Sequence, residues 1–223
     1  MKITLNEKEI KDSMPSEDEL ESMMMARHTP NVHNKIKKSK VAVAGLGGLG
    51  SNIAVMLARI GVGELLLVDF DVVELSNLNR QCYNISHIGM PKTLALKKQI
   101  EEINPFINVY THNIKVTKEN VSTLLNGYHI ICEAFDNPEA KSMLVNVALE
   151  ELTGTKIVAA SGMAGYGSSN LIKTTKPMKG LYVCGDMKNE AKIGQGLMAP
   201  RVQICAGHQA NMVLRLLLGI EEV

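Results

Sequence analysis

The segment FDVVELSNLNRQ, residues 70–81, places an arginine in a polar loop that follows a glycine-rich turn and a buried strand. Arg80 can bind two phosphate oxygens at once, and Lys92, at the start of the next predicted helix, offers a second, compact cation. Fixed cations of this kind offset the charge that develops during phosphoryl or nucleotidyl transfer. We therefore predict a catalytic role for both residues. The simpler alternative is that both are ordinary surface side chains.

The glycine-rich turn itself fits the pattern G-x-G-x-x-G. It contains Gly45, Gly47 and Gly50, with Gly48 as an additional glycine, and it lies between a predicted strand and a predicted helix. A turn of this kind lets backbone N–H groups and the helix N-terminus approach a phosphate. The alternative is that the glycines are needed only for packing the helix against the strand.

Two carboxylates follow predicted strands and complete the candidate site. Asp69 ends the second strand, where a carboxylate accepts hydrogen bonds from ribose hydroxyls, although it can also serve only to cap the loop. Asp136 comes just after the fourth strand. A carboxylate beside a triphosphate is repulsive unless a cation lies between them, so Asp136 predicts Mg²⁺. Asn137, directly before Pro138, is alternatively a helix cap.

The elements that must position these residues alternate along the chain. Apolar segments predict five buried strands, and helical patterns lie between them; the strands are residues 41–45, 65–69, 107–116, 128–135 and 155–162. Residues 167–177 predict a sixth, more polar strand, residues 179–200 a long loop, and residues 200–219 a final apolar helix. Such alternation predicts an α/β, Rossmann-like, doubly wound and mainly parallel sheet with helices on both faces. Ligands of such sheets bind outside the carboxyl ends of the strands.

Composition narrows the class of partner. The 223 residues carry a net charge of +1, which gives no electrostatic reason to expect nucleic acid or a membrane. The amino-terminal residues contain no apolar signal core, so we expect a cytoplasmic protein. The four cysteines form no C-x-x-C pair, so we predict free thiols and no zinc.

Four segments together resemble one known family. In chain order they are GLGGLGSN, LLLVDFDVVELSNLNRQ, GMPK and EAFDN. They closely resemble the ThiF/MoeB/HesA family of ubiquitin-activating-like adenylyltransferases, over about residues 36–219, and within it the shorter ThiF-like proteins of thiamine thiazole biosynthesis. The resemblance implies that the protein binds ATP and Mg²⁺. It also implies that the protein adenylates the C-terminal Gly-Gly carboxylate of a small ubiquitin-like sulfur-carrier protein resembling ThiS.

The same resemblance implies roles for individual residues. The glycine loop would hold phosphate, Asp69 the ribose, and Asp136 the Mg²⁺ ion, with Asn137 beside it. Four further side chains would contact ATP: Asn77, Arg80, Gln81 and Lys92. Family members are typically homodimers, and Arg27 is the candidate for an arginine that reaches the ATP of the partner subunit.

The chain also departs from the family's sequence pattern. Many relatives have a zinc-binding cysteine pair where this chain reads LYVC, with Leu181 in place of one cysteine. Some relatives also use a cysteine in sulfur transfer, and Cys184 is at most a substitute for it here. We predict a hairpin and helical arm over residues 1–35, with Met1 to Asp12 as a vestigial or docking hairpin, and an ATP-binding domain over residues 36–223. The alternatives are an NAD-dependent oxidoreductase, a scaffold that binds a carrier without chemistry, or a family member acting on another carrier, a peptide or a tRNA nucleoside.

Overall fold

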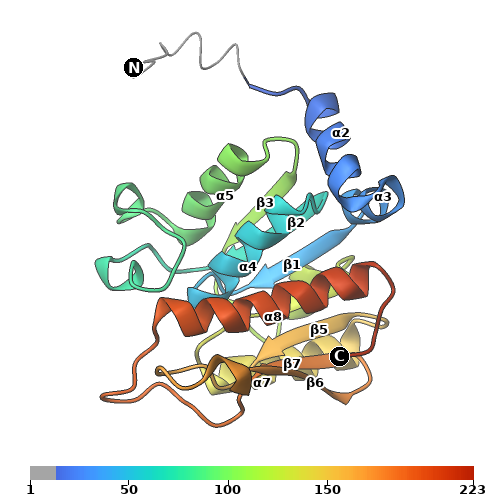
Figure 1. Cartoon of the computed structure of the whole chain (residues 1–223). Coiled ribbons are helices and arrows are strands. Elements are labelled where there is room, and N and C mark those ends of the chain that lie inside the picture. The colour runs from blue at the N-terminus through green and yellow to red at the C-terminus, as the bar shows by residue number, and fades with distance from the viewer. Residues whose placement is uncertain (1–13) are drawn as a thin grey trace.

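The computed structural model describes residues 14–223, so the predicted hairpin over Met1–Asp12 lies outside the described residues. Seven strands form one sheet in the order β3-β2-β1-β4-β5-β7-β6 (Figure 1). The first six in this order are parallel, and β6 pairs antiparallel with β7. The strands are β1 Lys40–Ala44, β2 Glu64–Asp69, β3 Asn108–Asn113, β4 Ile130–Glu133, β5 Lys156–Ala160, β6 Lys173–Met178 and β7 Leu181–Gly185.

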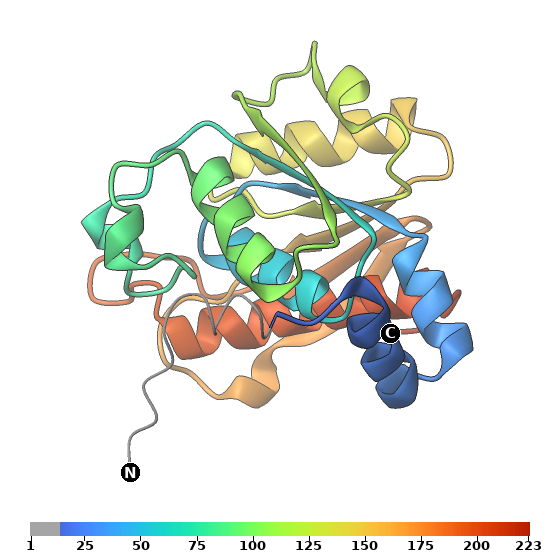
Figure 2. The same ribbon diagram turned by 90° about the horizontal axis from the view of Figure 1, so that it is seen from above.

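Helices cover both faces of this sheet, as the alternation of elements predicts. One face carries α4 (Gly48–Arg59), α5 (Lys92–Ile103) and α8 (Ala199–Leu217), and the other carries α6 (Val121–Leu125) and α7 (Pro138–Glu151) (Figure 2). Alternate residues of each strand therefore enter different cores. In β1, Val41 and Val43 belong to the core under α4, whereas Ala42 and Ala44 belong to the core under α7. The predicted fold class is confirmed.

The strand order changes direction between β1 and β4. From β1 the chain builds outward through β2 to β3, and it then returns to the other side of β1 with β4. In open parallel sheets this switch point leaves a crevice between the loops that follow the two central strands. Here those loops are the glycine-rich turn after β1 and residues 134–137 after β4.

Helix α2 (Glu17–His28) begins with a capping box. Its N-cap, Ser16, accepts a hydrogen bond from the Glu19 backbone N–H at 3.3 Å, and the Glu19 carboxylate accepts one from the Ser16 backbone N–H at 2.8 Å. The basic segment that follows forms α3 (Pro30–Lys37), which ends two residues beyond the predicted arm. It is helical because Ile36 and His33 are buried at 1% and 3% exposure, so tertiary packing outweighs its polar composition.

The prediction of one long loop over residues 179–200 is wrong at its start. Residues 181–185 form β7, which pairs in parallel with β5 and buries Tyr182 and Cys184 completely. The sixth strand, β6, occupies residues 173–178 and joins β7 through a turn at Gly180, whose φ is +82°. Four apolar residues between polar and glycine-rich flanks are too weak a pattern to reveal β7. Within residues 14–223, no helix combines the length and apolarity needed to cross a bilayer.

Candidate functional site

The glycine-rich turn leaves β1 in a conformation that only glycine accommodates easily. Gly45 has a φ of +88°, and a Cβ added there would lie 2.8 Å from the Ala134 carbonyl oxygen. A Cβ on Gly50 would lie 1.8 Å from the carbonyl oxygen of Gly45. Both glycines are therefore required by packing. Helix α4 begins at Gly48, which is partly exposed, and no side chain caps it; the first backbone N–H groups of a helix have no partner within the helix. The packing role is observed, and phosphate binding remains a prediction.

The polar loop after β2 lies directly against this turn. A Cβ placed on Gly48 would be 3.4 Å from Cγ of Arg80, and one on Gly47 would be 3.9 Å from the Gln81 amide nitrogen. Nη1 of Arg80 donates to the Ser76 carbonyl at 3.1 Å and to Asn79 Oδ1 at 2.9 Å. Nε of Arg80 and Oε1 of Gln81 are buried and have no hydrogen-bond partner among residues 14–223. The fold therefore brings the predicted arginine beside the predicted phosphate loop.

Two side chains of α4 that sequence reasoning left without a role hold these loops together. Asn52 donates to the Gly48 carbonyl at 2.6 Å and to the Arg80 carbonyl at 3.2 Å. Ser51 donates to the Gly47 carbonyl at 2.7 Å and accepts from the Cys82 backbone N–H at 3.2 Å. Both are buried, and their place directly after the glycine motif is the only mark that the sequence gives them.

Tyr83 gives a third connection between the same loops. Its hydroxyl donates to the Leu46 carbonyl at 2.8 Å, and its ring is 4% exposed. Burial, with a smaller effect of nearby Asp69, raises the pKa of this phenol well above its usual value. Tyr83 therefore stays protonated and acts as a neutral hydrogen-bond donor to the glycine loop.

Asp69 already has a structural task at the end of β2. Its Oδ2 accepts from the Leu46 N–H at 2.6 Å and its Oδ1 from the Asp71 N–H at 2.8 Å, so the loop-capping alternative is observed. Each carboxylate oxygen retains a second acceptor site, and ribose binding stays a prediction.

The predicted second cation, Lys92, is 6% exposed at the first position of α5. Its ammonium forms an ion pair with Asp71 at 2.8 Å, and its backbone N–H donates to the Asp71 carbonyl at 3.0 Å. The Asp71 side chain is half exposed. Lys92 is therefore anchored next to the polar loop, and its contact with triphosphate remains a prediction.

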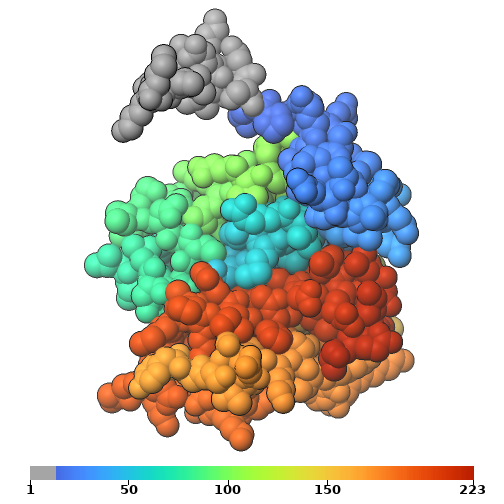
Figure 3. Space-filling view, in the orientation of Figure 1, coloured from blue at the N-terminus to red at the C-terminus, as the bar shows by residue number. Residues whose placement is uncertain are grey.

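The two amides of the polar loop also bind backbone groups. Oδ1 of Asn77 accepts from the Glu74 N–H at 3.1 Å and so closes the short 3₁₀ helix Leu75–Asn77. Asn79 donates to the carbonyl of Leu197 at 3.1 Å. Through this bond the polar loop contacts the loop that precedes α8, and both loops lie at the carboxyl edge of the sheet, on the left of Figure 1 and of the space-filling view in Figure 3.

Asp136 lies on the other side of the crevice. It is exposed, and it lies in a loop that Phe135 presses against Gly45, since a Cβ on Gly45 would be 2.9 Å from Cδ1 of Phe135. Asn137 caps α7 by accepting from the Ala140 N–H at 2.9 Å, as the helix-cap alternative predicts. Its predicted contact with ATP is not tested by this geometry.

The donor set suits Mg²⁺ carried in with a nucleotide better than a resident metal. Among residues 14–223, no group of three or more His, Cys, Asp or Glu side chains could hold a metal ion. Mg²⁺ in nucleotide sites is commonly held by one or two carboxylates together with phosphate oxygens and water. A single exposed carboxylate, Asp136, beside a phosphate-type loop fits that arrangement.

The cysteine considered for sulfur transfer is buried. Cys184 has no exposed surface, and burial raises the pKa of its thiol to about 11 even though Thr174 lies 3.5 Å from the sulfur. A thiolate is the reactive form of cysteine, so this environment opposes a role in sulfur transfer.

Arg27 is exposed in the last turn of α2. In Figures 1 and 2 this helix lies toward the amino ends of the strands, away from the carboxyl edge. The prediction for Arg27 therefore requires a second copy of the chain.

A buried ion pair anchors the loop before α8. Arg201, in the first turn of α8, pairs with Asp186 and donates to the carbonyls of Gly167 and Ser168. Burial alone would raise the pKa of Asp186, but hydrogen bonds from Asn189, the Lys188 backbone and Arg201 outweigh it and lower the pKa to about 2. Asp186 is therefore a carboxylate throughout the physiological range.

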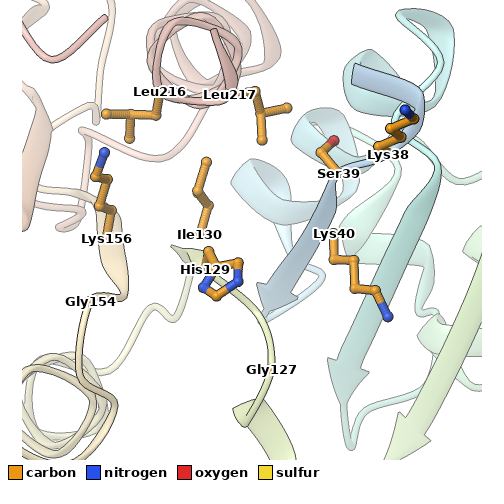
Figure 4. A pocket seen from close by; sticks show the side chains of 10 residues that line it. All are labelled: Lys38, Ser39, Lys40, Gly127, His129, Ile130, Gly154, Lys156, Leu216 and Leu217. Atoms are coloured by element: carbon orange, nitrogen blue, oxygen red, sulfur yellow. The ribbon is translucent and has the colours of Figure 1, made fainter. Parts of the chain in front are cut away.

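A cavity of about 410 Å³ lies at the opposite edge of the sheet from this site. It is formed by the amino ends of β1, β4 and β5 and the last turn of α8 (Figure 4). Two of its lysines are already paired, Lys40 with Glu64 at 3.1 Å and Lys156 with Glu221 at 2.7 Å. The cavity does not coincide with the residues predicted from sequence, and we assign it no part in the candidate site.

Known proteins share sequence and fold with this chain. The family described as "ThiF family" matches residues 20–223. The chain is 31% identical to the adenylyltransferase and sulfurtransferase UBA4 of Saccharomyces cerevisiae over 200 residues, covering 83% of the chain and 43% of UBA4. It is also 31% identical to the adenylyltransferase and sulfurtransferase MOCS3 of Dictyostelium discoideum, covering 97% of the chain and 52% of MOCS3. The chain thus spans about half the length of these curated relatives.

Among solved structures, the fold is similar to that of the E. coli tRNA N6-threonylcarbamoyladenosine dehydratase TcdA in complex with ATP. The TM-score is 0.81 at 21% identity, covering 92% of this chain and 97% of that one. At this identity the likeness concerns the fold alone.

Proposed function

Because the chain belongs to the ThiF family, we propose that it is an ATP-dependent adenylyltransferase acting on the C-terminal carboxylate of a small ubiquitin-like sulfur carrier. One observation carries the proposal beyond family membership. The stem of Arg80 packs on Gly48 at the switch point of the sheet, opposite the exposed Asp136. An oxidoreductase would explain the glycine loop and Asp69, but it would leave these two residues idle.

The reaction needs positioning and charge neutralisation rather than a general base. A terminal carboxylate is already ionised at neutral pH. One of its oxygens forms a bond to the α-phosphorus of ATP, the bond from that phosphorus to the bridging oxygen of the β-phosphate breaks, and pyrophosphate leaves with the electron pair. Arg80 and Lys92 offset the negative charge on the phosphates, while the N–H groups at the start of α4 bind phosphate oxygens.

Asp136 is the residue that would hold Mg²⁺, which, when bound with ATP, neutralises part of the phosphate charge. Asn52, Ser51 and Tyr83 keep the polar loop and the glycine loop in one arrangement before substrate arrives. Such preorganisation matters because charge stabilisation is strongest when the donors need not move during the reaction.

Pyrophosphate exchange tests the proposal directly. Purified protein is incubated with ATP and labelled pyrophosphate, with and without candidate carriers that end in a free Gly-Gly. We expect exchange that depends on a carrier, and no exchange with the same carrier lacking its last glycine. Tight carrier binding without exchange would instead favour a scaffold, and preferential binding of NAD would favour the oxidoreductase.

The identity of the carrier is the finer part of the proposal. The resemblance to short ThiF-like proteins favours a ThiS-like carrier of thiamine thiazole biosynthesis, whereas the relatives above are named as adenylyltransferases and sulfurtransferases of other systems. Exchange with a series of carriers decides between them. We further propose a cytoplasmic homodimer in which Arg27 of each subunit serves the ATP site of the other.

A further inference from the structure

A buried ion pair lies directly beneath the loop that carries Asp136. Glu133, the last residue of β4, has no exposed surface, and the ammonium of Lys141 lies 3.0 Å from its Oε1 and 2.9 Å from its Oε2. Lys141 belongs to α7, and its side chain is 23% exposed. Neither residue belongs to the glycine loop or to the polar loop after β2.

The pair fixes the backbone of the loop at Phe135. The Phe135 backbone N–H donates to Glu133 Oε1 at 2.7 Å, and the Lys141 ammonium donates to the Phe135 carbonyl at 2.7 Å. Both backbone groups of Phe135 are therefore bound by the pair, one residue before Asp136. The Asn137 cap binds the chain one residue after it. Asp136 projects between two fixed points.

The same loop is registered against the glycine turn. Ala134 and Phe135 fill the space in which a Cβ on Gly45 would lie, so a shift of this loop would also move it relative to the phosphate site. On the face of the sheet that α8 covers, Gln209 donates to the carbonyls of Glu133 at 3.2 Å and Val158 at 3.0 Å. The position of Asp136 therefore depends on a chain of contacts that begins at Glu133 and Lys141.

Stability alone is a poor reason for this arrangement. Apolar residues of similar volume often replace a buried ion pair without loss of stability, because desolvation of both charges offsets much of their attraction. A directional pair, however, fixes backbone groups that apolar side chains cannot hold. We propose that Glu133 and Lys141 are positioning residues that hold the Asp136 carboxylate at the distance from the glycine loop needed for a metal–nucleotide complex. This inference rests on the proposed function.

Metal binding tests the inference separately from catalysis. Mn²⁺ binding to the full chain in the presence of α,β-methylene-ATP is measured by electron paramagnetic resonance, and binding of the same nucleotide without metal by calorimetry. For Lys141→Met we expect Mn²⁺ affinity to fall about tenfold or more, while metal-free nucleotide binding, made through the glycine loop, changes less than about threefold. Lys141→Arg, which can keep both hydrogen bonds, should restore most of the Mn²⁺ affinity, and exposed Lys98→Met is the matched control.

A double variant guards against simple unfolding. Removal of one partner leaves a buried charge, whereas Glu133→Leu combined with Lys141→Met removes both, so we expect the double variant to fold. It should still lose Mn²⁺ affinity, because the Phe135 backbone is no longer held. Wild-type Mn²⁺ affinity in the folded double variant would overturn the inference.

Pyrophosphate exchange by the wild-type chain tests the proposed function independently of the binding measurements. If the wild-type chain binds Mn²⁺ and nucleotide with the expected split among variants but exchanges no pyrophosphate with any carrier, the positioning role stands and the adenylyltransferase proposal fails. If the wild-type chain shows no metal-dependent nucleotide binding, both are overturned.

Discussion

Individual polar residues at this site bind backbone groups as well as offering contacts to a ligand. Asp69 caps the glycine loop, Asn77 closes a 3₁₀ turn, and Asn137 caps α7. Arg80 differs, because its Nε is buried without a partner among the described residues while its stem packs on Gly48. A group left unsatisfied in this way is expensive unless a ligand supplies the missing partner. At the residue scale, a substitution of Arg80 is therefore the most direct test of the site.

Arg80→Ala should lose adenylate formation while it retains the fold. Hydrogen bonds to charged groups contribute about 1.5–3 kcal/mol each, which corresponds to a loss of roughly tenfold to a hundredfold in pyrophosphate exchange per contact. Arg59→Ala, at the exposed end of α4, is the control and should exchange normally. Near wild-type exchange by a folded Arg80→Ala protein would contradict the assigned role.

Asp136→Asn should separate metal dependence from nucleotide recognition. An amide keeps the size of the side chain but removes its charge, so we expect a several-fold to hundredfold higher Mg²⁺ requirement for exchange. Titration of Mg²⁺ at saturating ATP measures this requirement. An unchanged Mg²⁺ requirement would remove Asp136 from the metal site.

At the scale of elements, the junction between β1 and α4 sets the geometry of the site. At Gly45 and Gly50 of this junction an added side chain would meet backbone atoms, whereas some glycines elsewhere in the chain face open space. Gly207 in α8, with nothing within 4 Å of its would-be Cβ, is one of the latter. Gly50 is therefore needed because another backbone segment approaches it closely, whereas no such approach requires glycine at position 207.

Gly50→Ala should lower the free energy of unfolding by about 3 kcal/mol or more, because the added methyl would meet the Gly45 carbonyl oxygen at 1.8 Å. Gly207→Ala should instead raise it by about 0.5–1 kcal/mol, as is usual for this exchange in a helix interior. Urea denaturation monitored by circular dichroism compares the two. A Gly50→Ala protein as stable as wild type would show that the junction relaxes easily.

The Asp186–Arg201 pair should make the carboxyl-edge loops sensitive to acid. The pKa of Asp186 is lowered to about 2 in the folded chain, against about 4 for an unperturbed aspartate. Its contribution is therefore complete above about pH 4 and is lost as the pH falls toward 2. Asp186→Asn should show a shallower decline in the free energy of unfolding between pH 5 and pH 3, with Asp18→Asn as the control. An identical slope in Asp186→Asn would contradict the assignment.

At the scale of the whole molecule, most of the sheet could be predicted because its central strands are short, apolar and separated by helical patterns. Strand β7 could not, since its polar flanks resemble a loop and only its pairing with β5 makes it a strand. The end of helix α3 at Lys37 could not be predicted either, because the burial of Ile36 is a tertiary effect.

The candidate site divides in the same way. The switch-point rule predicts that Arg80, Gly48 and Asp136 lie at one edge of the sheet, although they are far apart in sequence. The bridging bonds of Ser51 and Asn52 and the support of Asp136 by Lys141 depend on side-chain geometry. No spacing rule encodes such contacts, so they had to come from the structure.

Assembly can be tested by mixing inactive variants. If Arg27 acts on the partner's ATP, Arg27→Ala and Arg80→Ala subunits should each be inactive alone, whereas a re-equilibrated equal mixture should regain about a quarter of wild-type exchange. Half of the randomly assorted dimers are then mixed, and each mixed dimer has one complete site. No recovery, in a mixture shown to exchange subunits, would place Arg27 outside the active site.

Helix α8 packs along α4, and Val202 in its first turns approaches to 3.0 Å of the position of a Cβ on Gly48. Because a ribosome makes the chain from its amino end, the turn around Gly48 emerges long before the segment that covers it. In a partly synthesised chain, the apolar side of that turn would be exposed to solvent. Competence to hold ATP should therefore arise late in synthesis, so that ribosome-bound chains halted before residue 199 neither retain nor consume the nucleotide.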